Sequence, residues 1–176
     1  MTKPSVQPIE SELVRLRLLE EADLEMTLAW RNQDHIRKWF LTSSMLAFDQ
    51  HRNWFLNYQT RDNDFIFVIE SKAHGSVPVG QISLYDIDFE DRMGEYGRLM
   101  IGSPLAARQG IARESTRLIL QFAFEMLKLE EIYLSVLVNN ERAINLYKTC
   151  GFSADGQDGK TLKMSIRKPR DFQTIS

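Results

Sequence analysis

The sequence lacks several features that mark particular classes of protein. It contains a single cysteine, Cys150, so no internal disulfide can form and a reducing, cytoplasmic location is expected. No run of about 18 apolar residues is present, and residues 1–11 are polar, so we expect neither a membrane span nor a signal peptide. The formal net charge of −2 gives no electrostatic basis for binding nucleic acid or an anionic membrane.

Familiar catalytic and phosphate-binding motifs are missing as well. A P-loop needs Lys and then Ser or Thr after its last glycine, and a dinucleotide fingerprint needs three glycines; here Gly110 stands alone before Ile111 and Ala112. No Ser-His-Asp or Cys-His arrangement is evident. The acidic residues between positions 86 and 90 have no histidine or cysteine beside them, so no metal site is expected.

The order of the predicted elements is that of one α/β domain. Periodicity predicts strands at residues 13–19, 64–71, 77–88, 93–102, 131–138 and 160–168, and helices at 20–32, 34–41, 49–59, 111–128 and 140–151. A strand–helix–strand crossover after an antiparallel meander predicts a mixed, mostly antiparallel sheet of about seven strands, with helices on both faces. We expect a single domain over residues 1–176, with a polar N-terminal extension at 1–11 and a C-terminal tail at 170–176.

One helix start is unusual, because the long helix that follows residue 110 has no Ser, Thr, Asp or Asn directly before it. Uncapped N–H groups at a helix N-terminus attract anions, and Gly110 permits close backbone approach. Arg108 and Arg113 add positive charge, which indicates a phosphate or pyrophosphate ligand. On this feature alone an ordinary turn is the favoured interpretation, because glycine often does no more than end or begin an element.

A second pattern favours the phosphate-binding interpretation over an ordinary turn. It has the spacing N-x-x-A-x-x-L-Y-x-x-x-G-F and consists of Asn140, Ala143, Leu146, Tyr147, Gly151 and Phe152. Together with the glycine turn it resembles the GCN5-related N-acetyltransferase (GNAT) superfamily, whose acyl-CoA loop reads Q/R-x-x-G-x-G/A. Gly110 and Ala112 match this loop, whereas Ala107 stands where the family often has Gln or Arg. The matched region spans residues 94–152 in the expected order of elements.

The resemblance implies how the cosubstrate acetyl-CoA is held. The loop N–H groups of this superfamily bind the pyrophosphate, which corresponds here to Arg108, Gln109, Gly110, Ile111, Ala112 and Arg113. The pantetheine arm pairs like an extra strand with the backbone of Leu99, Met100 and Ile101. Asn140 contacts the pantetheine or caps its helix, and both roles are compatible.

Transfer of an acyl group from a thioester to an amine needs a neutral amine, a stabilised oxyanion and a leaving thiolate that is protonated or tolerated. Tyr147 matches the family's thiolate-proximal tyrosine, a general acid, while the alternative is a packing aromatic. Glu95 lies where related enzymes often carry an acidic base that acts directly or through water. A solvated strand carboxylate is an equal alternative for Glu95.

The N-terminal helices bear on the acceptor. Residues 29–40, 48–55, 80–88 and 94–101 are similar to the branch that acetylates nucleotide-linked amino sugars, such as the UDP-4-amino-4,6-dideoxy sugar of pseudaminic acid biosynthesis used in flagellin glycosylation. A nucleotide sugar needs aromatic surface for its base and cations for its diphosphate. The candidate acceptor-binding residues are Trp30, Arg31, Asn32, His51 and Tyr85. Core anchoring is the favoured alternative for the tryptophan.

Two other functions stay open. One is a protein N-terminal acetyltransferase of the ribosomal alanine type, whose related loop also has alanine at the position of Ala112. The other is a non-catalytic acyl-CoA-binding module, which the presence of Tyr147 disfavours. The expected partner is a small-molecule substrate, and neither nucleic acid nor a membrane is expected. Only the family resemblance implies a homodimer.

Overall fold

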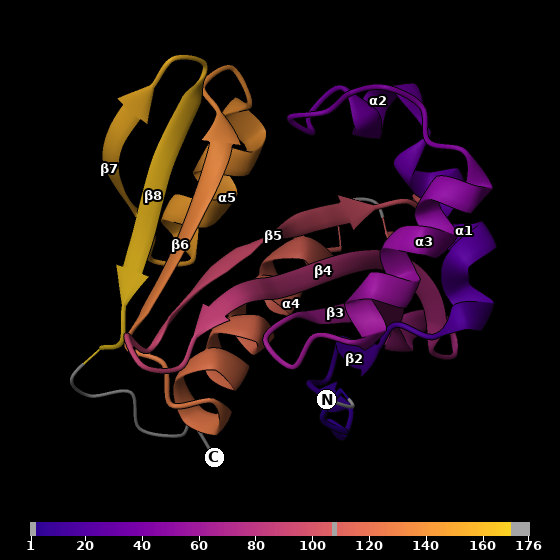
Figure 1. Ribbon diagram of the computed structural model, residues 1–176, viewed down its shortest axis with the longest axis horizontal. Helices are drawn as coiled ribbons and strands as arrows, with labels where there is room; N and C mark the ends of the chain where they lie inside the picture. The colour runs from indigo at the N-terminus through magenta and orange to yellow at the C-terminus, as the bar shows by residue number, and fades with distance from the viewer. Residues whose placement is uncertain (1–2, 107–108, 170–176) are drawn as a thin grey trace.

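The computed structural model describes residues 3–106 and 109–169, in which eight strands form one sheet (Figure 1). The strands are β1 (Ile9–Glu10), β2 (Val14–Leu18), β3 (Phe65–Ser71), β4 (Val77–Asp88), β5 (Met93–Ile101), β6 (Glu131–Leu137), β7 (Ser153–Asp158) and β8 (Thr161–Arg167). Their order is β1-β2-β3-β4-β5-β6-β8-β7, and β5 with β6 is the parallel pair among otherwise antiparallel described neighbours. The predicted mixed, mostly antiparallel sheet is thereby confirmed.

Two of these strands were not predicted. β7 reads Ser-Ala-Asp-Gly-Gln-Asp and is exposed along its whole length, so neither apolar alternation nor intrinsic β propensity marks it. It forms because Ser153 to Asp158 pair with β8, which is itself strongly patterned. β1 has two residues, too few for any periodicity to be visible.

The helices are α1 (Leu24–Arg31), α2 (Asp34–Arg37), α3 (Phe48–Gln59), α4 (Ile111–Gln121) and α5 (Glu141–Thr149). Short 3-10 turns, η1 (Glu21–Asp23), η2 (Lys72–His74) and η3 (Pro104–Ala106), accompany them, and α4 continues as the π-helical turn η4 (Phe122–Met126). The long helix predicted to about residue 128 thus ends in a π turn. Within the described part of the chain, no helix is long and apolar enough to cross a bilayer.

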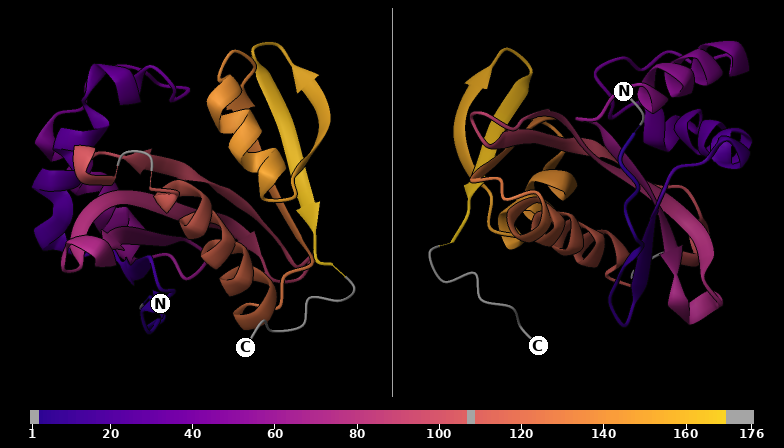
Figure 2. Two further views of the ribbon diagram at one scale, coloured as in Figure 1. Left: turned by 180° about the vertical axis from the view of Figure 1, so that it is seen from behind. Right: turned by 60° about the horizontal axis from the view of Figure 1, so that its bottom comes forward.

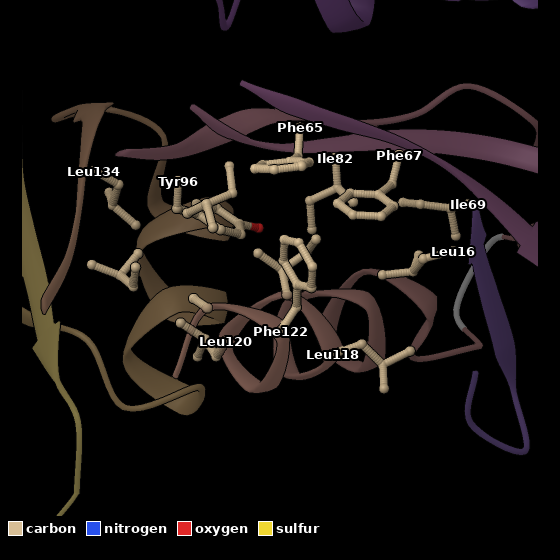
Figure 3. Packing of buried hydrophobic residues seen from close by; sticks show 14 of the residues in the cluster. Leu16, Phe65, Phe67, Ile69, Ile82, Tyr96, Leu118, Leu120, Phe122 and Leu134 are labelled. Carbon is tan, nitrogen blue, oxygen red and sulfur yellow. The ribbon is translucent and has the colours of Figure 1, made fainter. Parts of the chain in front are cut away.

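Helices cover both faces of the sheet, as expected (Figure 2). On one face the main core lies between the sheet and α4, where Phe122 packs edge-on against Phe65 at 5.3 Å and Phe67 at 5.4 Å between ring centroids (Figure 3). On the other face α1 and α3 cover Ile66 and Val68 of the same strand β3. β3 is therefore buried on both faces.

Two irregularities of β5 shape the middle of the sheet. The register with β4 shifts between Gln81 and Ser83, which pair with Met100 and Gly97, so β5 carries an extra residue there. Arg98, inside this bulge, has a positive φ of 52°. On its other side β5 pairs with β6 over Met93–Glu95 alone, after which the two strands separate (Figure 1).

Candidate active site

The first turn of α4 begins at Gly110, whose φ of 72° lies in the left-handed region. A Cβ at this position would meet no atom within 4 Å, so glycine is needed for its backbone conformation rather than for space. Among the residues that the structure describes, no side chain caps this helix start, which leaves the first-turn N–H groups available to an anion. Arg108, expected to contact the pyrophosphate, lies outside the described residues, as does Ala107.

The other loop residues divide into structural side chains and exposed ones. The Gln109 amide donates to the carbonyl of Leu105 at 2.8 Å, and Ile111 is buried in the main core. The carbonyl of Ala112 accepts from Thr116 Oγ1 at 2.7 Å, which secures the first turn from inside. Arg113 is exposed. The first-turn N–H groups and Arg113 are therefore the described groups that stay candidates for binding an anion.

Leu99, Met100 and Ile101 lie at the end of β5, beyond the bulge. Met100 is buried against Trp30 and Ile36, while Leu99 and Ile101 pack against the main core on the opposite face. These contacts fix the strand through its side chains. Among the described residues, no strand pairs with this segment on the side from which β6 has departed, so its backbone groups are free to pair with an extended ligand.

Asn140 is the N-cap of α5, because its Oδ1 accepts a hydrogen bond from the N–H of Ala143 at 3.3 Å. The capping half of its expected dual role is therefore present. At the other end of α5 the chain leaves the helix at Gly151, with a φ of 102°, as the sequence predicted. The contact of Asn140 with pantetheine stays a prediction.

Tyr147 lies in the last turn of α5 and is 8% exposed. Its ring packs edge-on against Tyr96 of β5, with 5.5 Å between centroids, and against Phe152. Burial, together with the nearby Cys150, raises the pKa of Tyr147 to about 12, so the hydroxyl stays protonated at neutral pH. None of the hydrogen bonds formed among the described residues uses this hydroxyl, and its proton is available to a ligand.

Glu95 lies on β5 opposite Tyr85 of β4, and the Tyr85 hydroxyl donates a 2.9 Å hydrogen bond to Glu95 Oε1. Burial raises the pKa of Glu95, an effect that this hydrogen bond and the Arg98 charge oppose. The Arg98 guanidinium stacks on the Tyr85 ring at 3.9 Å and donates to both oxygens of buried Asp64, at 3.1 and 3.2 Å. Tyr85 and Arg98 therefore favour the ionised form of Glu95, which burial disfavours.

The candidate base and acid lie on opposite faces of the sheet. Glu95 and Tyr96 are neighbours on β5, so their side chains point to opposite sides. Glu95 contacts Tyr85 on the face covered by α1 and α3, while Tyr96 contacts Tyr147 on the face covered by α4 and α5. The pairing of β5 with β6 ends at Glu95 itself. A molecule inserted between the separating strands thus has a carboxylate on one side and a phenol on the other.

Two of the candidate acceptor residues, Trp30 and Arg31, are buried at the end of α1. The Trp30 indole covers the backbone at Gly102, where even a Cβ would overlap it, which supports a core role. The Arg31 guanidinium stacks on Phe40 at 4.0 Å and donates one hydrogen bond, to the Thr42 carbonyl. Arg31 Nη1 is buried without a partner among the described residues, and no carboxylate there forms an ion pair with it.

Asn32 and His51 tie the helices to each other. Asn32 Nδ2 donates to the Leu46 carbonyl and its Oδ1 accepts from the Leu46 N–H, both at 2.9 Å, which anchors the segment before α3. His51 Nε2 lies 3.0 Å from Thr27 Oγ1, and its ring stacks on Trp54 at 5.0 Å. Burial lowers the pKa of His51. These contacts give both side chains a structural role between α1 and α3.

Sequence reasoning missed four polar residues on this face. Arg98 and Asp64 form the ion pair beside Tyr85, and no local pattern marked either of them. Gln81 and Ser83 lie on β4 two residues apart, buried on the same face as Tyr85. The sequence does contain a signal for these two residues, because polar residues alternate with Ile82 and Leu84 in a strand that is buried on both sides.

Comparisons with known protein families, sequences and solved structures all indicate the same family. A family model described as an acetyltransferase (GNAT) domain matches residues 14–153. The spermidine N(1)-acetyltransferase of Vibrio cholerae serotype O1 is 30% identical over 142 residues, which cover 80% of this chain and 79% of the relative. The crystal structure of spermidine N-acetyltransferase from Vibrio cholerae in complex with CoA and spermine has a TM-score of 0.80 at 26% identity, over 89% of this chain and 96% of that one.

A second solved structure, apo FdhC, described as a nucleotide-linked sugar GNAT, also has a TM-score of 0.80. Its identity is 21%, over 92% of this chain and 90% of that one, so this likeness shows the fold alone. The superfamily resemblance found in the sequence is confirmed, and the interpretation as a non-catalytic module is set aside. The chain belongs to the GNAT acetyltransferase family and is an N-acetyltransferase, one of the acyltransferases.

Proposed function

We propose that this chain transfers the acetyl group of acetyl-CoA to the amine of a nucleotide-linked amino sugar of the UDP-4-amino-4,6-dideoxy type. The observation that carries the catalytic part is the position of Glu95 and Tyr147 on opposite faces of the sheet, where β5 and β6 separate. The acceptor can then approach from the side of α1 and α3, and the coenzyme from the side of α4 and α5.

The described residues fit acetyl-CoA, which supplies the activated acetyl group. The uncapped first turn of α4, from Gly110 to Arg113, would hold the pyrophosphate on its N–H groups. The unpaired backbone of Leu99 to Ile101 would hold the pantetheine arm as an added strand. In both places the unpaired groups belong to the backbone, and the pyrophosphate and the pantetheine amides of acetyl-CoA can form hydrogen bonds with them.

Glu95 is the proposed base. It accepts a proton from the acceptor's ammonium, directly or through a water molecule, so that the neutral nitrogen can form the new N–C bond while the C–S bond breaks. Its pKa is raised by burial, which makes the carboxylate a stronger base than an exposed glutamate. The hydrogen bond from Tyr85 orients the carboxylate.

Tyr147 is the proposed acid at the leaving sulfur. Full proton transfer from a phenol of pKa about 12 to a thiolate whose conjugate acid has a pKa near 8.5 is uphill by roughly 5 kcal/mol. The phenol therefore acts most readily by hydrogen-bonding to the sulfur as negative charge develops there. Starting from the ammonium, the nitrogen loses two protons: one passes through Glu95 to solvent, and the other ends on the thiolate, so the products are the amide and the free thiol of CoA.

Arg31 supports an anionic acceptor. A buried cation without a counter-charge is costly, and its free Nη1 indicates that an anion completes the site. Burial lowers the pKa of Arg31, and the nearby Arg37, which is itself paired with Asp34 at 2.8 Å, lowers it further. The diphosphate of a nucleotide sugar supplies two negative groups, and Arg is suited to bind them.

A polyamine is the second candidate acceptor. The relative that is 30% identical is a spermidine N(1)-acetyltransferase. Burial raises the pKa of Tyr133, and the nearby carboxylates of Glu95, Asp86 and Asp88 raise it further, so this end of the site is acidic. A long polycation is favoured by these groups but disfavoured by Arg31 and Arg98.

The test is thiol release from acetyl-CoA by the full chain with three acceptors: a UDP-4-amino-4,6-dideoxy sugar, spermidine and a peptide with N-terminal alanine. We expect kcat/KM to be at least about 10-fold higher for the sugar, with the N-acetylated product identified by mass spectrometry. Arg31→Met should raise KM for the sugar and leave KM for acetyl-CoA unchanged. Turnover of spermidine or peptide without turnover of the sugar would contradict the proposed acceptor.

A further inference from the structure

A groove of ≈ 320 Å³ crosses the outer strands of the sheet. It is lined by Tyr133, Leu134 and Ser135 of β6, Asp155 of β7, and Lys163 and Met164 of β8. The side chains of Leu134 and Met164 are buried in the main core, so these two residues line the groove with their backbone. Small-molecule sites usually have volumes from roughly 300 Å³ upwards, so the groove can hold part of a ligand.

The strand register places this groove beside the proposed base. Tyr133 pairs with Glu95 where β5 and β6 are still joined, and residues paired across neighbouring strands share a face. Ser135 follows Tyr133 by two positions and pairs with Lys163, so these side chains point to the same face as well. Besides burial, the charge of Glu95 raises the pKa of Tyr133, which agrees with their proximity.

This side of the outer strands is open. The residues of α5 pack on the opposite side of β6 and β8, and Figure 1 shows no described helix in front of these strands. Ser135, Asp155 and Lys163 are exposed, and Tyr133 is partly exposed. Within the described parts of the chain, none of these four side chains takes part in a hydrogen bond or an ion pair, so their polar groups are available to a ligand.

The groove presents an aromatic ring near Glu95 and a positive charge farther away. The face of the Tyr133 ring is apolar, and the C–H groups of a sugar ring can pack against it. Lys163 is two strands and two positions away from Glu95, which places the two Cα atoms roughly 12 Å apart at the usual strand spacing and rise per residue. Its ammonium is a compact point charge, and lysine is a common phosphate-binding residue.

We infer that this groove holds the acceptor sugar nucleotide, with the Tyr133 ring against the sugar ring and the Lys163 ammonium bound to the diphosphate. This inference rests on the proposed function and names residues that recognise its acceptor. In a 4-amino sugar nucleotide the amine and the diphosphate are attached at opposite ends of the ring. An amine at Glu95 therefore lies a ring's length from the diphosphate, and the position of Lys163 matches that separation. The diphosphate has two negative groups, so Lys163 acts in addition to Arg31.

Asp155 lines the same groove with the opposite charge, which makes it the matched counterpart of Lys163. An anionic acceptor is attracted by Lys163 and repelled by Asp155, whereas a polyamine is attracted by Asp155 and repelled by Lys163. The substitutions Lys163→Met and Asp155→Asn therefore report the sign of the charge that the groove binds. Both side chains are exposed, so neither substitution should change the thermal midpoint appreciably.

The test measures KM for the UDP-4-amino-4,6-dideoxy sugar in wild type and both variants. Lys160→Met is the control, because Lys160 is an exposed lysine in the β7–β8 turn that does not line the groove. We expect Lys163→Met to raise KM about 10-fold through loss of a charge-assisted contact, Asp155→Asn to leave KM equal or lower, and Lys160→Met to stay within about twofold. KM for acetyl-CoA should not change in any of them. The inhibition constant of UDP, which measures binding without acetyl transfer, should rise in Lys163→Met alone.

The outcomes separate this inference from the proposed function. If wild type acetylates the sugar while Lys163→Met binds sugar and UDP as well as Lys160→Met does, the groove is not the diphosphate site and the proposed function stands. If Asp155→Asn raises KM and Lys163→Met lowers it, the groove binds a cation and the inference is wrong. Wild type that fails to acetylate the sugar overturns the proposed acceptor and the inference together.

Discussion

At the scale of residues, the alternation of side chains along β5 sets where the proposed base and acid lie. Glu95 and Tyr96 are adjacent, yet one contacts Tyr85 on one face and the other contacts Tyr147 on the opposite face. Tyr96 is fully buried, and its hydroxyl lies 2.9 Å from Thr116 Oγ1, so it fixes β5 against α4. The positions of the proposed base and acid thus follow from one strand.

Tyr147→Phe removes the proposed acid and keeps the ring that packs against Tyr96. We expect kcat to fall about 100-fold, the usual loss when a hydrogen-bond donor to developing negative charge is removed, while the Kd for CoA changes less than about twofold. Steady-state kinetics and calorimetric titration with CoA measure the two effects. Equal losses in both quantities would instead indicate a packing role for this tyrosine.

The pH dependence reports on Glu95. Because the base must be deprotonated, kcat/KM should rise with pH through the raised pKa of Glu95. Glu95→Gln should lower kcat about 100-fold and abolish this limb, leaving only the titration of the acceptor amine. A profile identical to that of wild type, apart from scale, would mean that Glu95 is not the base.

Tyr85→Phe gives a finer test of the same site. The Tyr85 hydrogen bond lowers the pKa of Glu95 because it stabilises the charged form. Its removal should raise that pKa further and move the ascending limb of kcat/KM to higher pH. A loss of rate without any displacement of the limb would show that Tyr85 acts in another way.

At the scale of elements, the glycine at the start of α4 has a matched counterpart in the chain. Gly110 and Gly75 have φ of 72° and 75°, and a Cβ on either meets no atom within 4 Å. Valine at either position should therefore cost a similar 1–2 kcal/mol, roughly, in backbone strain. Gly110→Val alone should also weaken CoA binding, by about 10-fold, because it displaces the first-turn N–H groups.

Chemical denaturation and calorimetric titration of both valine variants separate strain from binding. If Gly110→Val and Gly75→Val lose equal stability and bind CoA equally well, the loop at residue 110 is not the pyrophosphate site. If both lose CoA affinity, the effect arises from global destabilisation. The assignment requires a loss of affinity confined to Gly110→Val.

Elements with a buried face were predictable, and exposed or irregular ones were not. β4 and β6 follow from apolar patterning, and the end of α5 follows from Gly151. The bulge at Arg98 has no local signal, because a non-glycine residue at positive φ is decided by its tertiary contacts. The sequence around His51 is compatible with either a ligand pocket or a contact between helices. The structure places His51 at the contact between α1 and α3.

At the scale of the whole molecule, the sheet consists of two parts joined by a short parallel ladder. β1 to β5 form one part and β6 to β8 the other, and their shared register is Met93–Glu95 against Glu131–Tyr133 (Figure 1). The proposed acid belongs to α5, beside the second part, and the proposed base to the first. A coenzyme bound between them therefore connects both parts.

Hydrogen exchange should reveal this connection. CoA is expected to slow amide exchange at Leu99 to Ile101 and in the first turn of α4, while β7 at the far edge of the sheet stays unaffected. At a CoA concentration of about 100 times Kd, mass action contributes roughly 2.7 kcal/mol to global stability. Protection spread evenly over all strands, with none in excess at residues 99–101, would argue against an added-strand mode of binding.

The same separation has a practical consequence for handling the protein. When no coenzyme is present, Leu99–Ile101 and residues 134–136 of β6 have no strand partner, within the described residues, on the sides where β5 and β6 separate. Such edges are templates for pairing with other chains. Preparations stripped of CoA should slowly lose monodispersity in storage, and a small excess of the coenzyme in the buffer should preserve them.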